Sequence, residues 1–163
     1  ALVPLVNDQD EVIGSKERDQ IMLTDMNRGT GLWLTNSHGE ILLTKRSLLK
    51  KHGPGKWCEA AGGTVEIDET YKSNIYKEAL EEIGLEITNL TIGPKQIVTN
   101  YNSFFMQWFV GTSDVAISDL KLQPEEVSEA RWFTRAEFEA LLKTSPEMFT
   151  VPLVVFAPLL LNL

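Results

Sequence analysis

Three glutamates in the middle of the chain, Glu78, Glu81 and Glu82, have the types and spacing to do metal chemistry. They stand three and four residues apart in a segment with helical periodicity, so their side chains would share one helix face. Carboxylates crowded in this way are accommodated either by water on a solvated face or by a divalent cation. Their hard oxygen atoms suit Mg²⁺, and also Mn²⁺. The glutamates alone leave both interpretations open.

The element that must position these glutamates is predicted to be a helix from about Thr70 to Ile83. Asp68 is the expected N-cap, and Gly84 is the expected C-terminal stop. At about 100° per residue, one broad apolar face forms that should pack on a sheet. Its members are Ile75, Tyr76, Ala79, Leu80 and Ile83.

Two glycines and a further glutamate precede this helix. Gly62 and Gly63 allow a backbone carbonyl or amide to approach a ligand without side-chain obstruction, although a tight turn or bulge explains them equally well. Glu69 stands near the helix start, where it can complement the helix dipole or pair with Lys77.

Together these residues resemble the signature of the Nudix hydrolase family, G-x5-E-x7-R-E-U-x-E-E-x-G-U, where U is aliphatic. The match begins at Gly63, continues through Glu69 and ends with KEALEEIGL at residues 77–85. One fixed position differs, because Lys77 stands where the family has arginine. So many fixed positions in one short segment are far more specific than a lone glycine pattern.

The resemblance implies a role for each matched residue. The metal ligands would be the carbonyl of Gly62 and the carboxylates of Glu78, Glu81 and Glu82, which would also be the catalytic residues. Glu69 and Lys77 would form a structural brace for the helix. Lysine keeps the charge of arginine but lacks its planar fork, so the bracing geometry is left open.

The resemblance extends beyond this signature. Residues 45–47, 54–57, 61–63 and 126–134 follow the order usual in the family, and residues 5–14 are similar to the branch related to isopentenyl-diphosphate isomerase. Substrate contacts are expected from Arg46, a candidate for phosphate, and from Trp57, a candidate for stacking that would otherwise pack in the core. Further candidates are Glu125 or Glu126 as a base and Tyr101, Phe104, Phe105 and Trp108 as pocket or core residues.

The isomerase branch raises an alternative activity. An isomerase needs a cysteine shortly before the signature and histidines that hold a metal. Aligning the loops puts Ala61 at about the cysteine position, and Cys58 falls three positions too early, which on a strand points it to the other face. Residues 26–29 lack the expected histidine. The intact glutamates therefore favour a hydrolase. A non-catalytic binding module is a third interpretation, which the retained carboxylates disfavour.

Length, composition and charge are also consistent with an enzyme that acts on a small molecule. The 163 residues fit one domain, 43% of them are hydrophobic, and the net charge of -8 argues against a partner that is a nucleic-acid polymer. One cysteine excludes an intrachain disulfide and is compatible with the cytoplasm. The apolar run from Val151 to Leu161 is too short to span a membrane, so a packed segment is expected there.

The chain is therefore predicted to be an α/β (α+β) protein, a Nudix-type α/β/α sandwich with a mixed β-sheet between helices. Residues 1–163 form a single domain, with a strand pair in 1–20, the signature loop and helix in 63–85, and a packed C-terminal segment in 144–163. Other expected elements are a hairpin of strands at 31–35 and 40–45, a loop at 50–56, an extended stretch at 57–65, strands within 97–111 and at 130–133, and a helix at 135–143 capped by Thr134.

The expected activity is the hydrolysis of a diphosphate bond in a nucleoside diphosphate derivative or a similar small molecule. The resemblance implies that a metal-activated water attacks one phosphorus with Mg²⁺ as the cofactor. The expected partner is a small phosphorylated substrate, and no signal indicates the oligomeric state.

Overall fold

The computed structural model describes all residues from 1 to 163. Three α-helices and eight strands make up the fold, with short 3₁₀ turns between some of them. The strands are β1 (Leu2–Val6), β2 (Val12–Glu17), β3 (Met26–Thr35), β4 (Ile41–Arg46), β5 (Trp57–Cys58), β6 (Thr91–Thr99), β7 (Ser103–Thr112) and β8 (Val127–Phe133). The helices are α1 (Tyr71–Ile83), α2 (Arg135–Thr144) and α3 (Val151–Leu161).

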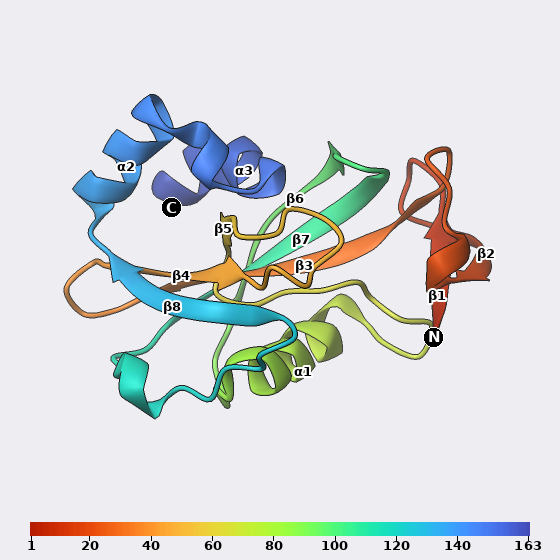
Figure 1. The fold of residues 1–163 in the computed structure, drawn as a ribbon. Helices are drawn as coiled ribbons and strands as arrows, with labels where there is room; N and C mark the ends of the chain where they lie inside the picture. The colour runs from red at the N-terminus through yellow and green to blue at the C-terminus, as the bar shows by residue number, and fades with distance from the viewer.

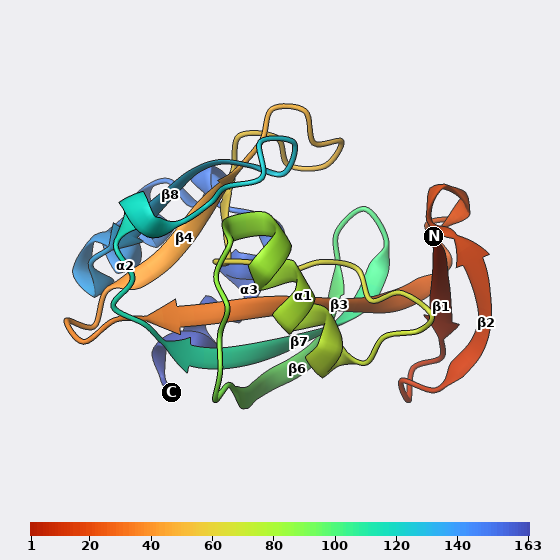
Figure 2. The same cartoon turned by 90° about the horizontal axis from the view of Figure 1, so that it is seen from below.

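A mixed sheet lies between helices, as the sequence predicts. Its strand order is β5-β4-β3-β7-β6, with β8 added to β4, and β3 and β7 run parallel while the other pairs are antiparallel. Helix α1 covers one face, and α2 and α3 cover the other (Figure 1). The same layers are seen from below in Figure 2, with β1 and β2 forming a separate hairpin at one end.

The sheet splits between β3 and β4, and this split makes room for the functional site. The two strands form the expected hairpin, with Gly39 at φ 75°, but they pair only at Thr35 and Ile41. Beyond that point the expected extended stretch takes the place of β4 beside β3. Its Ala61 carbonyl accepts the Leu32 N–H at 2.8 Å. Only Trp57–Cys58 of that stretch forms a strand, and that strand pairs with β4.

Helix α1 begins within one residue of the predicted start, but its N-cap differs from the prediction. Thr70 is the N-cap, not Asp68, because its side chain accepts the Ser73 N–H while the Ser73 hydroxyl accepts the Thr70 N–H. This reciprocal capping satisfies two N–H groups that a helix start leaves unpaired. The predicted stop is confirmed, since Gly84 adopts φ 66°, a left-handed conformation that favours glycine.

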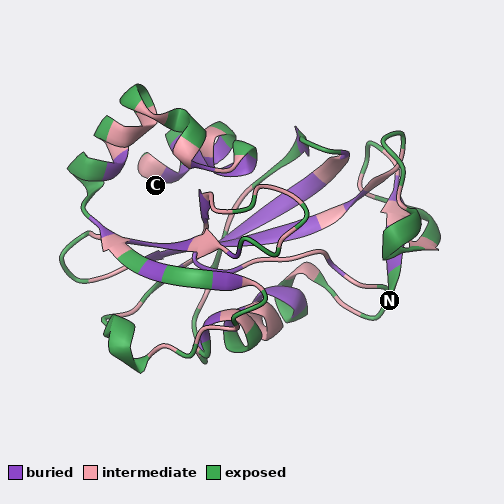
Figure 3. Ribbon diagram, viewed as in Figure 1, coloured by how far each residue is buried: buried purple, intermediate pink, exposed green.

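The face that α1 turns to the sheet is narrower than predicted. Ile75, Ala79 and Ile83 are fully buried, but Leu80 is 55% exposed because it lies 100° around the helix from Ala79. Asn74 is buried instead, and its side chain binds polar groups of the loop and of β3. Figure 3 shows the burial concentrated on the central strands and on the inner sides of the helices.

The packed C-terminal segment is a helix, a conformation that the sequence analysis did not assign to it. Pro152 lies in the first turn of α3, where a missing N–H costs nothing. Leu153, Phe156 and Leu160 are buried against the sheet in the same core as Trp108 and Phe133. None of the helices is both long enough and apolar enough to cross a membrane.

The N-terminal hairpin is fastened to the rest of the molecule by Asp10 in its turn. The Asp10 carboxylate accepts from Arg28 of β3, from the Tyr71 hydroxyl of α1 and from Lys95 of β6, at 2.7 to 2.9 Å. Arg28 pairs with Asp10 while 20% of its side chain is exposed, so this contact lies partly in solvent. The turn thereby orders the end of the sheet next to α1.

Candidate active site

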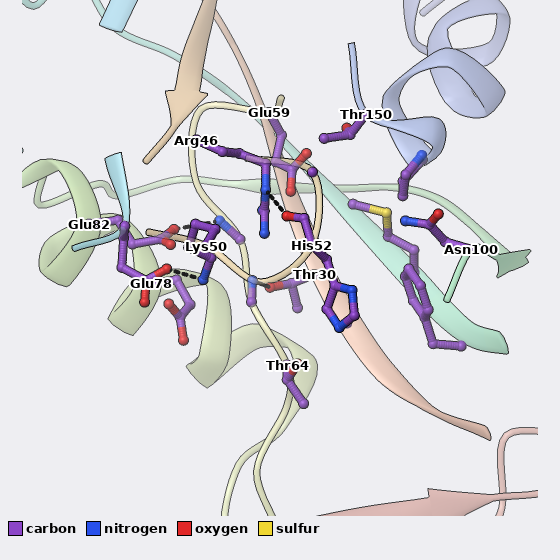
Figure 4. Close-up of a pocket in the computed structure, with 18 of the residues that line it drawn as sticks. Thr30, Arg46, Lys50, His52, Glu59, Thr64, Glu78, Glu82, Asn100 and Thr150 are labelled. Carbon is purple, nitrogen blue, oxygen red and sulfur yellow. Dashed lines mark hydrogen bonds and ion pairs between the residues drawn. The ribbon is translucent and has the colours of Figure 1, made fainter. Parts of the chain in front are cut away.

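A cleft of about 550 Å³ opens where the sheet splits, between α1 and the loop that follows β4. Figure 4 shows many of the side chains that line it. Three acidic groups come from α1 and three more from loops outside it, several basic groups come from the end of β4 and the loop that follows it, and much of the remaining wall comes from β3, β7 and the start of α3. The cleft thus collects residues from parts of the chain that are far apart in sequence.

The three glutamates of α1 are not equivalent in this cleft. Glu82 accepts the backbone N–H of Gly62 at 2.9 Å. Glu78 is largely buried, with 16% of its side chain exposed, and a Cβ built on Gly63 would lie 2.7 Å from its carboxylate carbon. Glu81 is exposed at the rim. The two glycines therefore let a loop backbone pass directly over the Glu78 and Glu82 carboxylates.

Burial changes the protonation of the two inner glutamates. It raises the pKa of Glu82 to about 8, against the lowering effect of the Gly62 N–H, and the nearby carboxylates of Glu78, Glu59 and Glu126 add to the rise. It raises the pKa of Glu78 to about 7, although Lys77 opposes the rise. Carboxyl groups held in such surroundings gain from a cation that would pair with their charged form.

The carbonyl of Gly62 faces the same side as these carboxylates. The carbonyls of Ala61 and Gly63 accept N–H groups of β3, whereas the Gly62 carbonyl accepts no hydrogen bond from the protein. In extended backbone the N–H and C=O of one residue point the same way, and the Gly62 N–H points to Glu82. The unpaired carbonyl is therefore available to a ligand on the α1 side.

The predicted brace between Glu69 and Lys77 is present. The Lys77 ammonium lies 2.6 Å from one Glu69 oxygen. The other oxygen accepts the Glu66 N–H and the Asn74 amide. Lysine, lacking the second arm of a guanidinium, contacts the carboxylate at a single atom, and its ammonium also lies 3.7 Å from Glu78.

The opposite side of the cleft is basic. Arg46 uses its Nε to bind the His52 carbonyl at 2.9 Å, which leaves the two terminal nitrogens of the guanidinium without a protein partner. Lys50 pairs with Glu126, which is one of the two glutamates predicted as candidates for the general base. The proposed phosphate contact of Arg46 therefore has free donors within the cleft.

The aromatic candidates separate into core and cleft. Trp57, expected to contact substrate, is 8% exposed, meets Phe133 edge to face at 5.1 Å, and does not line the cleft. The packing alternative therefore holds for Trp57, and it is withdrawn as a substrate residue. Phe105 and Trp108 are also buried, whereas Tyr101 and Phe104 line the cleft.

Several cleft residues were not assigned from the sequence, and four of them bear on the chemistry. Glu59, whose pKa burial raises, faces the cleft from the stretch that replaces β4 beside β3. Lys50 and His52 stand in the basic loop, and Asn27 lies at the start of β3. Side chains alternate between the two faces of an extended stretch, and this alternation could have indicated that Glu59 faces the cleft. The run of basic residues at 50–52 could have indicated that the loop lines it. Nothing in the sequence marks Asn27.

The donor set fits a hard divalent cation, although one side chain must turn to complete it. In the side-chain positions of the structure, no three acidic, histidine or cysteine groups are arranged to hold one ion. Glu78, Glu82 and the free Gly62 carbonyl already lie together, and Glu81 at the rim has the freedom to rotate inward. Carboxylate and carbonyl oxygens are the ligands that Mg²⁺ and Mn²⁺ prefer.

A family model described as the NUDIX domain matches residues 25–151. The chain belongs to the Nudix family. An uncharacterized Nudix hydrolase from Pseudomonas aeruginosa is 34% identical over 143 residues, which are 83% of this chain and 79% of the relative. An isopentenyl-diphosphate Delta-isomerase from an Enterobacter species is 31% identical over 160 residues, 91% of this chain and 84% of the relative. A crystal structure of a Deinococcus radiodurans protein has a TM-score of 0.81 at 26% identity, covering 97% of this chain and 98% of that one.

These similarities confirm the resemblance and the fold predicted from the signature residues. The chain is a Nudix hydrolase enzyme, and Nudix hydrolases generally use divalent metal ions and cleave diphosphate bonds. The isomerase relative covers nearly the whole chain as well, so the branch similarity noticed at residues 5–14 reflects a relation along most of the sequence.

In metal-free buffer, we expect the free energy of unfolding to decrease by about 1–3 kcal/mol as the pH rises from 5 to 8. The pKa of Glu82 is raised to about 8 and that of Glu78 to about 7, against 4.5 for the ordinary group. Between these values the folded chain holds protons that the unfolded chain has released, so stability falls with rising pH. Urea titrations at several pH values measure the slope.

The matched control for this slope is Glu82→Gln, which keeps an acceptor for the Gly62 N–H but does not titrate. This variant should flatten the dependence, and Mg²⁺ added to the wild type at pH 8 should restore the lost stability. A wild-type stability that rises across this pH range would contradict the assignment of buried, cation-seeking carboxyls.

Proposed function

We propose that this Nudix hydrolase uses Mg²⁺, or Mn²⁺, to cleave the diphosphate bond of a nucleoside diphosphate derivative or a similar small molecule. The observation that carries the proposal is the pair of buried carboxylates, Glu78 and Glu82, packed against a loop whose Gly62 carbonyl is unpaired. Opposite them, Arg46 offers free guanidinium nitrogens. A diphosphate with its cation would be neutralised from both sides of the cleft.

In the proposed reaction, different residues of the cleft bind the cation, bind the phosphate and accept a proton. Glu78, Glu81, Glu82 and the Gly62 carbonyl would hold the cation, which when bound neutralises phosphate charge and lowers the pKa of a coordinated water. Arg46 binds a phosphate oxygen through its terminal nitrogens. A carboxylate of the cleft accepts the proton of the attacking water. The Glu69–Lys77 pair keeps the start of α1 in register with the loop.

Isomerase activity is the second candidate, because one relative is an isopentenyl-diphosphate Delta-isomerase. The structure places Cys58, the single thiol, in the interior, where burial raises its pKa and Thr44 contacts its sulfur at 3.6 Å. A buried, protonated thiol that does not line the main cleft is unsuited to proton transfer on a substrate carbon. The positions of the glutamates suit hydrolysis better.

The proposal predicts that the chain releases phosphate or a nucleotide from at least one member of a diphosphate panel in the presence of Mg²⁺. The panel contains nucleoside diphosphates, a nucleotide sugar, a dinucleotide and a prenyl diphosphate. Product release is measured by phosphate assay and chromatography, and double-bond migration in the prenyl substrate is measured by NMR. EDTA should abolish turnover, and Cys58→Ala should leave it within about twofold.

Two results would overturn this proposal. Migration of the double bond without phosphate release, lost in Cys58→Ala, would establish the isomerase. Binding of a panel member without any turnover, with Mg²⁺ or Mn²⁺ present, would establish a non-catalytic module.

A further inference from the structure

The hydrophobic part of the cleft lies at one end, away from the glutamates. Among all the residues that line the cleft, the hydrophobic ones are Tyr101, Phe104, Met106 and Val151. They come from β7, the turn before it and the start of α3, whereas the carboxylates come from α1. We call the space bounded by these four residues, Asn27 and His52 the inner pocket. A substrate whose diphosphate lies between Glu82 and Arg46 would place its organic group there.

Glycines in β3 create the space on the floor of the inner pocket. A Cβ on Gly29 would lie 3.4 Å from the Phe104 ring, and a Cβ on Gly31 would lie 2.7 Å from the Met106 methyl group. Because side chains alternate along a strand, Asn27 shares this face with the two glycines. It is paired in parallel register with Phe104. Gly29 and Gly31 contribute no side chains to this floor. Asn27 therefore supplies the polar side chain next to them.

Asn27 is buried, with 7% of the residue exposed, and its amide is held in one orientation. The Asn102 amide nitrogen donates to the Ser103 carbonyl at 3.0 Å and to the Asn27 Oδ1 at 2.8 Å. Since the carbonyl fixes which Asn102 atom is nitrogen, Asn27 must turn its oxygen to Asn102. Its own Nδ2 then makes no hydrogen bond within the protein, although the residue lines the cleft.

The mouth of the inner pocket carries a flat aromatic surface. His52 stacks on Tyr101 with ring centroids 3.7 Å apart and planes 9° apart. The pKa of His52 is lowered by burial and by the positive charges of Lys51 and Arg46, so the imidazole stays neutral at neutral pH. A neutral stack of this kind offers a face to a planar ring without demanding a charged ligand.

We propose that the inner pocket binds a nucleobase and that Asn27 is a specificity-determining residue, donating its amide hydrogen to a carbonyl oxygen or ring nitrogen of the base. This inference rests on the proposed function, because it places the base where the diphosphate would direct it. The Asn27 amide nitrogen is open to the cleft, so a ligand that covers it must supply an acceptor or leave the donor buried and unpaired, which costs free energy. A purely hydrocarbon prenyl group would leave the donor unpaired and is disfavoured for that reason.

The experiment compares Asn27→Asp and Asn27→Leu with the wild type. Asn27→Asp keeps an oxygen for Asn102 but presents an acceptor to the pocket, and Asn27→Leu removes the polar group at similar size. Binding of a nucleoside monophosphate and of ribose 5-phosphate is measured by calorimetry without metal. Asn100→Asp, which makes the same charge change at an exposed position on the cleft rim, is the matched control.

We expect both Asn27 variants to weaken binding of the nucleoside monophosphate about tenfold, with little change for ribose 5-phosphate. Asn100→Asp should change either affinity less than about threefold. In turnover assays, KM for a nucleoside diphosphate should rise about tenfold while kcat changes little. Thermal melts establish that each variant is folded.

Equal losses for the nucleotide and for ribose 5-phosphate would overturn the inference, because the effect would then not involve the base. Unchanged affinity in both Asn27 variants would overturn it as well. The binding arm needs no catalysis, so a wild-type protein that binds nucleotides through Asn27 but hydrolyses none would refute the proposed function and leave the inner pocket assigned.

Discussion

Replacing Glu82 by glutamine is expected to reduce turnover by at least about a thousandfold while leaving the protein folded. Glutamine is nearly the same size, and its amide oxygen can still accept the Gly62 N–H that Glu82 accepts at 2.9 Å. What the variant loses is a negative charge in a largely buried place. A cation and a diphosphate together depend on that charge, so the loss should appear in the transition state and in metal affinity.

The measurement is kcat and KM on the best substrate of the diphosphate panel, over a range of Mg²⁺ concentrations. Glu86→Gln is the matched control, because Glu86 is exposed, follows the same helix and makes no ion pair. It should retain turnover within about twofold. A Glu82→Gln enzyme with wild-type kcat at every metal concentration would remove Glu82 from the catalytic group, since no compensating carboxylate occupies its bond to Gly62.

Local signals explain why much of the acidic side of the cleft was predictable. The spacing of Glu78, Glu81 and Glu82 sets their positions on a helix, and the pair Gly62 and Gly63 marks a loop that passes close to it. These relations span few residues and need only helical geometry. The Lys77 contact with Glu69 follows for the same reason. The hairpin at Gly39 and the stop at Gly84 are equally local.

The remaining cleft residues depend on contacts that sequence patterns do not carry. Asn27 and Phe104 lie side by side because β3 and β7 pair in parallel, a register that no local motif encodes. Trp57 was a candidate both for stacking on a substrate and for packing in the core, and its contact with Phe133 decides for packing. Similarly, Asp68 has a side chain suited to a helix N-cap, but Thr70 is the N-cap because it forms the reciprocal hydrogen bonds with Ser73.

Competition between local propensity and burial also explains the error in α1 and the conformation of α3. Leu80 is hydrophobic but lies at the margin of the buried stripe, and the buried position goes to Asn74, whose polar bonds tie the helix to β3. The C-terminal run was predicted to pack, but its two prolines left its conformation unassigned. Pro152 is compatible with a helix start, and burial of the apolar side chains stabilises the helix around Pro158.

Gly63→Ala should lower turnover by about a hundredfold or more with little loss of stability. The new methyl group would lie 2.7 Å from the carboxylate carbon of Glu78 and 2.8 Å from one of its oxygens. Gly63 does not adopt a left-handed conformation, so alanine fits the backbone, and the flexible end of Glu78 is what must move. The reduced freedom of the unfolded chain offsets part of any strain, by about 0.4–1 kcal/mol.

Two other glycines make this prediction discriminating. Gly14→Ala meets no atom within 4 Å and should leave both turnover and stability unchanged. Gly62→Ala places a methyl group 2.2 Å from the Thr30 carbonyl, which is backbone and cannot turn away, so it should destabilise the fold as well as the site. If Gly63→Ala alone loses activity while keeping its stability, the position of the Glu78 carboxylate matters to catalysis. If Gly63→Ala turns over like the wild type, the displaced carboxylate of Glu78 does not hold the cation, and the metal shell must be built from Glu81 and Glu82 instead.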